Sequence, residues 1–137
     1  MEIPIQDSIC VDASTSGNPG PTEYRGVDFR TGKVLFNYKL GVATNNIGEF
    51  LAIVHALALC KQQNLSVSVI YSDSVSAIAW VRNKKAKTQF DRNEKTEKVY
   101  DLIFRAEQWL KTNTTDISIL KWDTENWGEI PADYGRK

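Results

Sequence analysis

The stretch Ser8–Gly20 constrains the fold more than any other part of the chain. An apolar run, Ile9 to Val11, leads directly into Asp12 and then into a segment rich in Ser, Thr, Gly, Asn and Pro. This pattern predicts a strand over about 6–13 that ends in a turn. Asp12 then stands where a core residue is expected, and burying a lone carboxylate is costly unless a cation meets it.

The rest of the chain alternates strand and helix patterns. Two β-prone runs, 23–29 and 33–40, are joined by a short link that contains glycine, which predicts a hairpin. Residues 44–63 predict a long helix that is apolar over much of its circumference and so packs in the core across a sheet. The remaining predicted elements are a buried strand over 66–71, a helix over 73–83, an amphipathic helix after the basic loop 84–92, a strand over 117–122 and a helical turn at 131–133. The strand–helix–strand order implies one parallel pairing in an otherwise antiparallel sheet.

Length and charge limit the classes of protein that fit. With 137 residues, of which 42% are hydrophobic, the chain fits one domain over 1–137. Lys and Arg number 17, as do Asp and Glu, so attraction to a polyanion has to be local. Cys10 and Cys60 stand in apolar settings, which predicts buried, reduced thiols in a cytoplasmic protein. The sequence has no leader pattern and no apolar run near the ~18 residues of a membrane span, so we expect no membrane association.

Four acids stand at the start or end of predicted elements. Three of them have an ordinary alternative: Glu49 forms a capping box with Asn46, Asp73 caps the following helix, and Asp133 is a surface acid. Asp12, in the middle of a strand, has no capping role. Like charges brought together repel each other unless metal ions hold them. The set therefore predicts an acidic, Mg²⁺-binding nuclease site.

The residues around these acids form motifs whose order and spacing cover nearly the whole chain. They are Val11-Asp12-Ala13 with Gly17-Asn18-Pro19-Gly20, then Thr44-Asn45-Asn46-Ile47-Gly48-Glu49, Tyr71-Ser72-Asp73-Ser74 and Ala132-Asp133. Together they closely resemble the catalytic domain of type 1 ribonuclease H. The resemblance is strongest to the bacterial branch that ends in Trp-Gly-Glu-Ile-x-Ala-Asp-Tyr-Gly-Arg-Lys, present here as Trp127–Lys137.

The resemblance implies an α/β fold, a ribonuclease H-like five-stranded mixed sheet flanked by helices. It implies an endoribonuclease that hydrolyses the RNA strand of RNA–DNA hybrids without strong sequence specificity and leaves 5′-phosphate and 3′-hydroxyl ends. By the same resemblance, Asp12 bridges two Mg²⁺ ions, Asp133 completes one site, and Glu49 with Asp73 completes the other. Mn²⁺ can substitute, and Glu129 has an auxiliary catalytic role. The expected partner is the hybrid duplex, bound by a monomer with no obligate protein partner.

The resemblance also implies substrate contacts. Small side chains and backbone amides in the first turn and before the long helix suit contacts with 2′-hydroxyls in the minor groove. Alternatively, these Gly and Asn residues only allow the turn conformation, and Trp80 is a helix residue half buried in the core. The implied minor-groove residues are Thr15, Gly17, Asn18, Asn45 and Asn46; Thr44, Asn46 and the Thr88 region hold a DNA phosphate, and Trp80 packs on the DNA strand.

The chain departs from the family pattern at several positions. The loop before Asp133 has no histidine; the one histidine, His55, lies in the long helix and is expected to be packed or partly exposed. Val75 stands where close relatives often have a Gln that contacts a base. The basic handle of some members is reduced here to Lys84–Lys87. Positive charge for the DNA backbone comes from a cluster for which an ordinary exposed basic loop is the alternative: Arg82, Lys84, Lys85, Lys87 and Arg92.

Three other functions compete with this interpretation. A transposase-like enzyme of the same superfold would cut DNA and needs further domains. A non-catalytic module that binds hybrid duplexes gains nothing from negative charge opposite phosphates. In an ordinary α/β domain, the acids would only be caps and surface residues. Mg²⁺-dependent cleavage of a hybrid, compared with duplex DNA and duplex RNA, separates all three.

Overall fold

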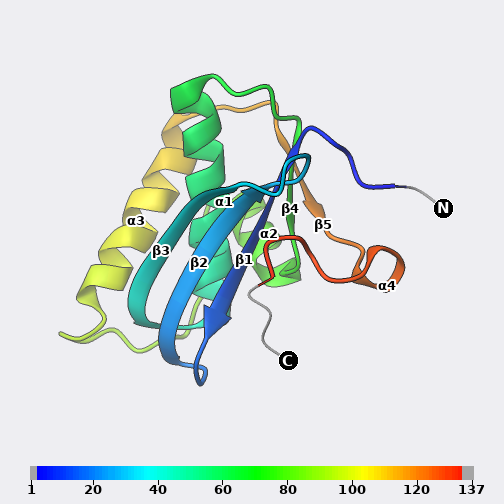
Figure 1. Cartoon of the computed structure of the whole chain (residues 1–137). Coiled ribbons are helices and arrows are strands. Elements are labelled where there is room, and N and C mark those ends of the chain that lie inside the picture. The colour runs from blue at the N-terminus through cyan, green and yellow to red at the C-terminus, as the bar shows by residue number, and fades with distance from the viewer. Residues whose placement is uncertain (1–2, 134–137) are drawn as a thin grey trace.

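A computed structural model describes residues 3–133 of the chain. Its strands are β1 (Ser8–Thr15), β2 (Gly20–Asp28), β3 (Val34–Ala43), β4 (Val69–Ser72) and β5 (Ser118–Lys121). Its helices are α1 (Asn45–Gln63), α2 (Val75–Asn83), α3 (Glu97–Thr112) and α4 (Thr124–Trp127). The strands form one mixed sheet in the order β3-β2-β1-β4-β5, with helices beside it (Figure 1). The predicted fold is confirmed.

The strand pairings differ from the prediction in one respect. β1, β2 and β3 form an antiparallel meander, and β1 pairs with β4 in parallel as expected. β4 and β5 are also parallel, so the sheet has two parallel pairings and the prediction of one was wrong. The reason is that α2 and α3 both lie between β4 and β5 in the chain, and this connection returns the chain to the end of the sheet from which β4 started.

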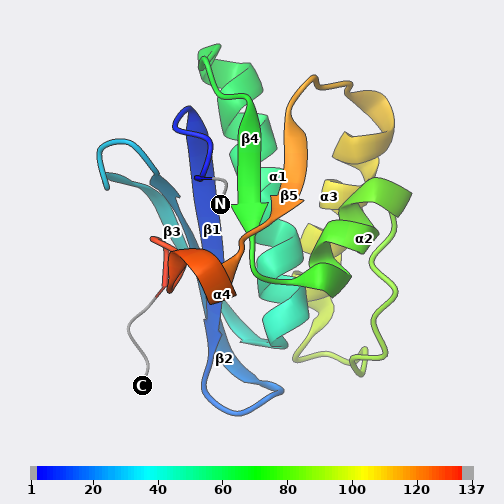
Figure 2. The same ribbon diagram turned by 90° about the vertical axis from the view of Figure 1, so that its right-hand side faces the viewer.

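The sheet separates two unequal hydrophobic clusters. α1, α2 and α3 lie on one side, and α4 with the segment leading to residue 133 lies on the other (Figures 1 and 2). Strand alternation divides β1 between these sides: Ile9, Val11 and Ala13 join the larger cluster under the helices, whereas Cys10 joins the smaller one. By the same alternation Asp12 faces the side of Cys10, near the strand's end.

Helix α1 packs tightly on β1. Its residues from Ile47 to Val54 are all buried, as the prediction of an apolar core helix requires. A Cβ atom at Gly48 would lie 2.8 Å from the Cβ of Ala13 and 3.1 Å from Cγ2 of Thr22, so the absence of a side chain allows the helix to approach the sheet. The next residue in the helix is Glu49, and this approach brings it to the ends of the central strands.

The helix starts also differ from the predictions. α1 is capped by Thr44, whose side chain accepts a hydrogen bond from the backbone N–H of Ile47, so Asn46 is not the cap. α2 begins at Val75 and its cap is Ser74, so Asp73 precedes the helix and does not cap it. Both carboxylates, of Glu49 and Asp73, are therefore left for other partners.

The segment after β5 was predicted least well. Asp123 caps the short helix α4, which the sequence analysis did not predict. Residues 131–133 form a hydrogen-bonded turn, not a helical one, in which the N–H of Asp133 donates to the carbonyl of Ile130. Two tryptophans, Trp122 and Trp127, pack edge to face at 4.9 Å and fix this segment against the sheet.

Both cysteines are buried, as their apolar sequence settings predict. Cys10 and Cys60 are buried free thiols, and burial raises the pKa of Cys10 to about 12. Over residues 3–133, none of the helices combines the length and the apolar character needed to cross a membrane.

Candidate active site

The carboxylate of Glu49 occupies the place where β1 and β4 separate. The parallel pairing of these strands extends to Cys10 and Tyr71, and both strands continue beyond it. There Glu49 Oε2 accepts a hydrogen bond of 2.7 Å from the N–H of Ala13, and Oε1 accepts one of 2.8 Å from the Ser72 hydroxyl. The N–H of Ala13 is a buried backbone donor that Glu49 helps to satisfy. Glu49, only 1% exposed, therefore has a fixed position.

Asp12 lies beside Glu49 and shares a hydrogen bond with it. Burial raises the pKa of Asp12, and the nearby charges of Asp133 and Asp73 raise it further. Burial and the contact with Asp12 raise the pKa of Glu49 well above its ordinary range. Two adjacent carboxylate charges in a buried site repel each other. A divalent cation bound between them would offset that repulsion.

Asp73 follows β4 directly and has partners from the neighbouring strand and helix. Its Oδ1 accepts a hydrogen bond of 3.0 Å from the Thr124 hydroxyl at the start of α4. The same oxygen lies 3.6 Å from Nζ of Lys121, the last residue of β5. The side chain of Asp73 is thus held towards β5 and α4.

Asp133 is held by Arg25 of β2, a residue that pairs with Asp12 across the sheet. The guanidinium donates from Nε to the carbonyl of Ala132 at 2.7 Å and from Nη2 to the carbonyl of Asp133 at 2.5 Å. Hydrogen bonds from a charged donor are the stronger ones. Two such bonds attach the backbone at Asp133 to β2, the strand that pairs with the strand of Asp12.

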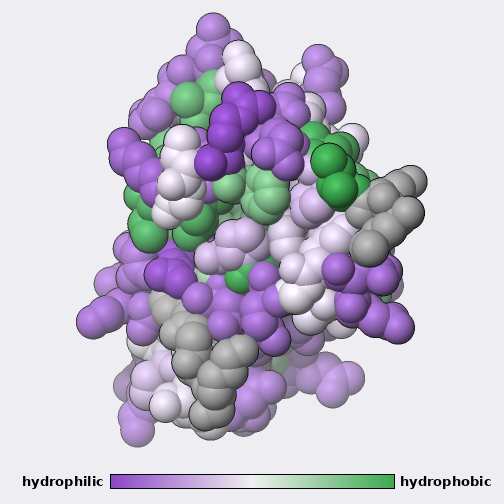
Figure 3. Space-filling model, turned by 45° about the vertical axis from the view of Figure 1, so that its right-hand side comes forward, coloured by the Kyte–Doolittle hydropathy of each residue, from purple (hydrophilic) through white to green (hydrophobic). Residues whose placement is uncertain are grey.

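All four acids line one pocket of about 440 Å³, together with Asn45, Asn46 and Ser74–Ser76. The carboxyl ends of β1 and β4 and the start of α1 lie in the lower half of the molecule as drawn (Figure 2), where hydrophilic side chains predominate on the surface (Figure 3). The structure therefore brings together Asp12, Glu49, Asp73 and Asp133, which belong to four separate parts of the chain.

The carboxylate oxygens that line this pocket suit a hard divalent cation such as Mg²⁺, which prefers such ligands and retains waters. Burial is the main cause of the raised pKa of Asp12 and of Glu49, and nearby carboxylates add to it; a divalent cation would favour the charged form of both groups. As the side chains stand, however, no three acidic, histidine or cysteine residues within 3–133 are close enough together to hold one ion. The residues fit the ion by chemistry and by location, and loading it requires side chains to move.

Glu129 lies apart from this pocket. It is exposed in the loop after α4, and it is not among the residues that line the cavity of the four acids. An auxiliary role for Glu129 therefore stays a prediction. The last four residues of the C-terminal motif, 134–137, lie outside the described residues.

A second pocket of about 460 Å³ adjoins the first and shares Asn46 with it. Its lining includes Lys87, one of the basic residues expected near the DNA backbone. Trp80 contacts Phe50 edge to face at 6.1 Å, which confirms that it lies half in the core. It also lines this cavity, and its contact with a DNA strand stays a prediction. The predicted contact residues in this pocket are Asn18, Thr44, Asn46, Trp80 and Thr88.

Three predicted contact residues stand elsewhere. Asn45 lines the acidic pocket, and its N–H donates to the side chain of Asn18 at 3.1 Å, which joins the first turn to the start of α1. Thr15 and Gly17 line neither pocket. Thr15 accepts a hydrogen bond of 3.3 Å from Thr22, and Gly17 has a φ of +82°, as turn chemistry requires.

The sequence analysis missed the partners of the acids. Ser72, Arg25 and Lys121 are polar residues inside or at the end of strands, and that was the only available signal. Ser72 contacts Glu49, Arg25 contacts the carbonyls of Ala132 and Asp133, and Lys121 contacts Asp73, so each partner is distant in sequence from the acid that it holds. Their roles depend on strand order, which local patterns do not give.

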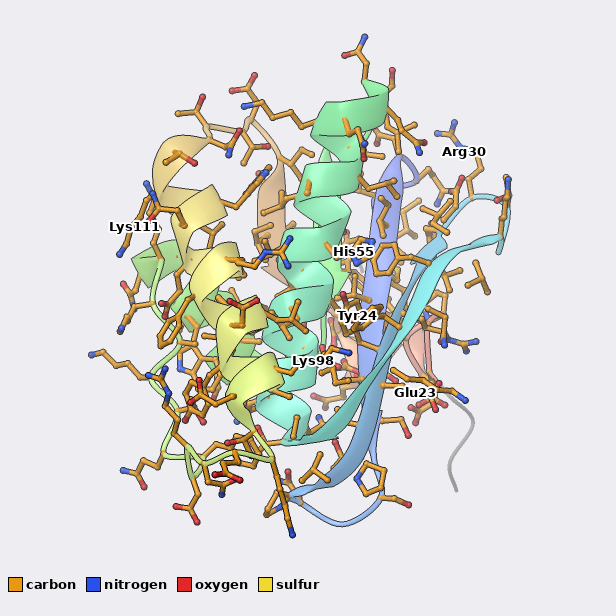
Figure 4. All side chains as sticks on the ribbon, turned by 90° about the vertical axis from the view of Figure 1, so that its left-hand side faces the viewer. Glu23, Tyr24, Arg30, His55, Lys98 and Lys111 are labelled. Carbon is orange, nitrogen blue, oxygen red and sulfur yellow. The ribbon has the colours of Figure 1, made fainter. Side chains whose placement is uncertain are left out.

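His55, as predicted, is packed and lies away from the acids. It projects from α1 towards β2 (Figure 4), where its Nδ1 lies 2.8 Å from the Tyr24 hydroxyl. Its ring stacks on Phe36 with the centroids 4.0 Å apart. Burial lowers the pKa of His55, which favours the neutral ring. His55 is thus part of the packing between α1 and the sheet.

Comparison with known proteins supplies the observation that decides the family. The sequence model of the RNase H family matches residues 6–124, which is most of the chain. The chain belongs to the ribonuclease H family. Among curated relatives, ribonuclease HI of Rickettsia prowazekii is 33% identical over 131 residues, which cover 91% of this chain and 84% of that protein. Ribonuclease H of Rickettsia typhi is 31% identical over the same shares.

Solved ribonuclease H structures support the fold. RNase H1 of Halobacterium salinarum aligns with a TM-score of 0.52 and 24% identity over 84% of this chain and 83% of that one. LC11-RNase H1 in complex with an RNA/DNA hybrid aligns with a TM-score of 0.51 and 19% identity over 86% of each chain. Family membership confirms that the chain is a ribonuclease H enzyme, and it excludes the ordinary α/β domain considered above.

Proposed function

We propose that the protein hydrolyses the RNA strand of RNA–DNA hybrids, without strong sequence specificity, at the pocket of the four acids. The observation that carries this proposal is the meeting of Asp12, Glu49, Asp73 and Asp133 in one cavity of a ribonuclease H family member. The relative solved in complex with an RNA/DNA hybrid supports the choice of substrate. A non-catalytic binder would have no use for so much negative charge opposite phosphates.

The proposed cofactors are two Mg²⁺ ions, for which Mn²⁺ can substitute. Such ions supply an activated water and stabilise the departing 3′ oxygen in an in-line displacement. In this proposal Asp12 contacts both ions, Asp133 completes one site, and Glu49 with Asp73 completes the other. The hydrogen bonds from Ala13 and Ser72 would hold the Glu49 carboxylate in place as a ligand. The products carry 5′-phosphate and 3′-hydroxyl ends.

The second pocket supports a proposed path for the DNA strand. Thr44, Asn46 and Thr88 offer hydroxyl and amide groups for a phosphate, and Lys87 adds local positive charge in a chain of zero net charge. Trp80 offers an aromatic face beside them. Because the two pockets share Asn46, a duplex can present one strand to each. We assign the 2′-hydroxyl contacts to Asn18, Asn45 and the first turn with Thr15 and Gly17, and an auxiliary catalytic role to Glu129.

The substrate preference is tested with three end-labelled duplexes of one sequence: an RNA–DNA hybrid, duplex DNA and duplex RNA. We expect cleavage of the hybrid's RNA strand in Mg²⁺, no cleavage in EDTA, and recovery in Mn²⁺. Cleavage of duplex DNA at a comparable rate would instead support the strand-transfer class. Binding of the hybrid without cleavage would support the non-catalytic module. We further propose that residues 1–137 act as one catalytic unit, active as a monomer, which gel filtration of the active fraction checks.

A further inference from the structure

We infer that Lys121 and Thr124 hold Asp73 in a resting arrangement from which a divalent cation has to displace them, so that Lys121 sets the affinity of the protein for that cation. The inference rests on the proposed role of Asp73 as a metal ligand. It concerns residues of β5 and α4, which lie outside the ligand set of the family resemblance. It also explains why the acids line one cavity without forming a ready cation site.

The position of Lys121 follows from the sheet. In the parallel pairing of β4 with β5, Lys121 is the register partner of Ser72, the residue before Asp73. Its ammonium donates a hydrogen bond of 2.8 Å to the carbonyl of Trp122 and lies 3.6 Å from Oδ1 of Asp73. The hydrogen bond to the backbone holds the ammonium beside Asp73, so the ion pair does not depend on a freely moving side chain.

Thr124 holds the same carboxylate oxygen from a different element. Its hydroxyl donates to Oδ1 of Asp73 at 3.0 Å from the first residue of α4. Oδ1 therefore receives a hydroxyl and an ammonium, which together resemble the polar environment that a bound cation and its waters would supply. Asp73 thus has both a hydroxyl and an ammonium as partners.

The surroundings of Asp73 make this ion pair different from an ordinary surface pair. The side chains of Asp73 and Lys121 are 32% and 44% exposed, so water screens the pair only in part. Asp73 also faces the pocket that contains Asp12, where its charge is close enough to raise the pKa of Asp12. Lys121 thus neutralises part of a repulsive cluster in the protein before any cation binds.

A cation that takes Asp73 as a ligand competes with this ammonium for the same oxygen. Removing the positive charge of Lys121 should therefore strengthen binding of the cation, whereas removing a residue that orients Asp73 for binding would weaken it. For a partly exposed ion pair, the expected change is roughly two- to fivefold. The sign of the effect distinguishes competition from orientation.

The test uses the full chain without nucleic acid and Mn²⁺ as the probe, with free Mn²⁺ followed by its electron paramagnetic resonance signal. We expect Lys121→Gln to bind Mn²⁺ about two- to fivefold more tightly than the parent. Lys121→Arg, which keeps the charge, should bind like the parent. Lys111→Gln removes the same charge at the far end of α3 (Figure 4) and controls for net charge. Lys121→Met is the second variant if Lys121→Gln does not fold.

Equal or weaker Mn²⁺ binding by the uncharged Lys121 variants, relative to Lys111→Gln, would overturn the inference. A double-mutant cycle gives a second criterion, since in the Asp73→Asn background the effect of Lys121→Gln should disappear. If it persists there unchanged, Lys121 does not act through Asp73, and the inference fails. Asp12→Asn separates this failure from that of the proposed function: Mn²⁺ binding that is insensitive to Asp12→Asn contradicts the metal site itself.

Discussion

At the scale of single residues, the contact between Asp12 and Glu49 determines how the protein responds to pH. Burial raises the pKa of both carboxyl groups above the ordinary values that they have in the unfolded chain. A carboxyl group with a raised pKa in the folded state favours folding below its ordinary pKa, and this contribution is lost as the pH rises through the raised value. Without a metal, the pair is therefore expected to destabilise the protein at neutral and alkaline pH.

Asp12→Asn should stabilise the metal-free protein, because the amide removes one charge from the buried cluster. Removing one charge from a buried cluster of like charges is an ordinary single-residue effect of roughly 1 kcal/mol, or about 3–5 °C in Tm. The measurement is calorimetric unfolding in EDTA at mildly alkaline pH, with the exposed Asp116→Asn as the matched control. A lower Tm for Asp12→Asn than for this control would contradict the assigned electrostatics.

At the scale of elements, the site depends on how closely α1 approaches β1. Gly48→Ala would place a methyl group 2.8 Å from the Cβ of Ala13, so the helix has to shift. Alanine usually stabilises a helix by up to about 1 kcal/mol relative to glycine, whereas overpacking a core costs about 1–3 kcal/mol. We expect a net loss of stability in urea unfolding. A gain in stability would show that the close approach of α1 is not required.

The strand β2 positions the last acid through Arg25. Arg25→Met should lower kcat by about tenfold to a hundredfold, because losing two hydrogen bonds to the carbonyls of Ala132 and Asp133 frees the segment that carries Asp133. Arg25→Lys should recover part of this loss, since it keeps one charged donor. Arg30→Met, in the exposed hairpin link, is the control. Unchanged kcat in Arg25→Met would refute the positioning role.

At the scale of the whole molecule, local signals predicted the individual strands and helices, whereas the five-stranded mixed sheet was implied by the resemblance to the ribonuclease H family. Apolar alternation and glycine-rich turns identify the strands, and Asp12 stands out as a charge within an apolar run. The second parallel pairing was not predicted, because strand order depends on packing between distant elements. For the same reason the capping hypothesis for Glu49 failed: its carboxylate reaches Ala13 and Ser72, which are 36 and 23 residues away.

The contacts that hold the acids were the least predictable part of the site. Thr124 and Asp73 are separated by 51 residues, and only the β4–β5 pairing brings them together. Arg25 and Ala132 are 107 residues apart. No periodicity or motif in either segment indicates such a partner. The acids were recognisable from their own surroundings, whereas the residues that control them become visible only in three dimensions.

The most direct measurement of the central claim is the rate of Mg²⁺-dependent cleavage of a labelled RNA–DNA hybrid by four single variants: Asp12→Asn, Glu49→Gln, Asp73→Asn and Asp133→Asn. Because the four carboxylates share one cavity and metal assistance is worth several kcal/mol, each variant should lose about a thousandfold or more in rate while it still binds the hybrid. Asp116→Asn should cleave like the parent. Near-parental cleavage by any two of the four variants would contradict the account.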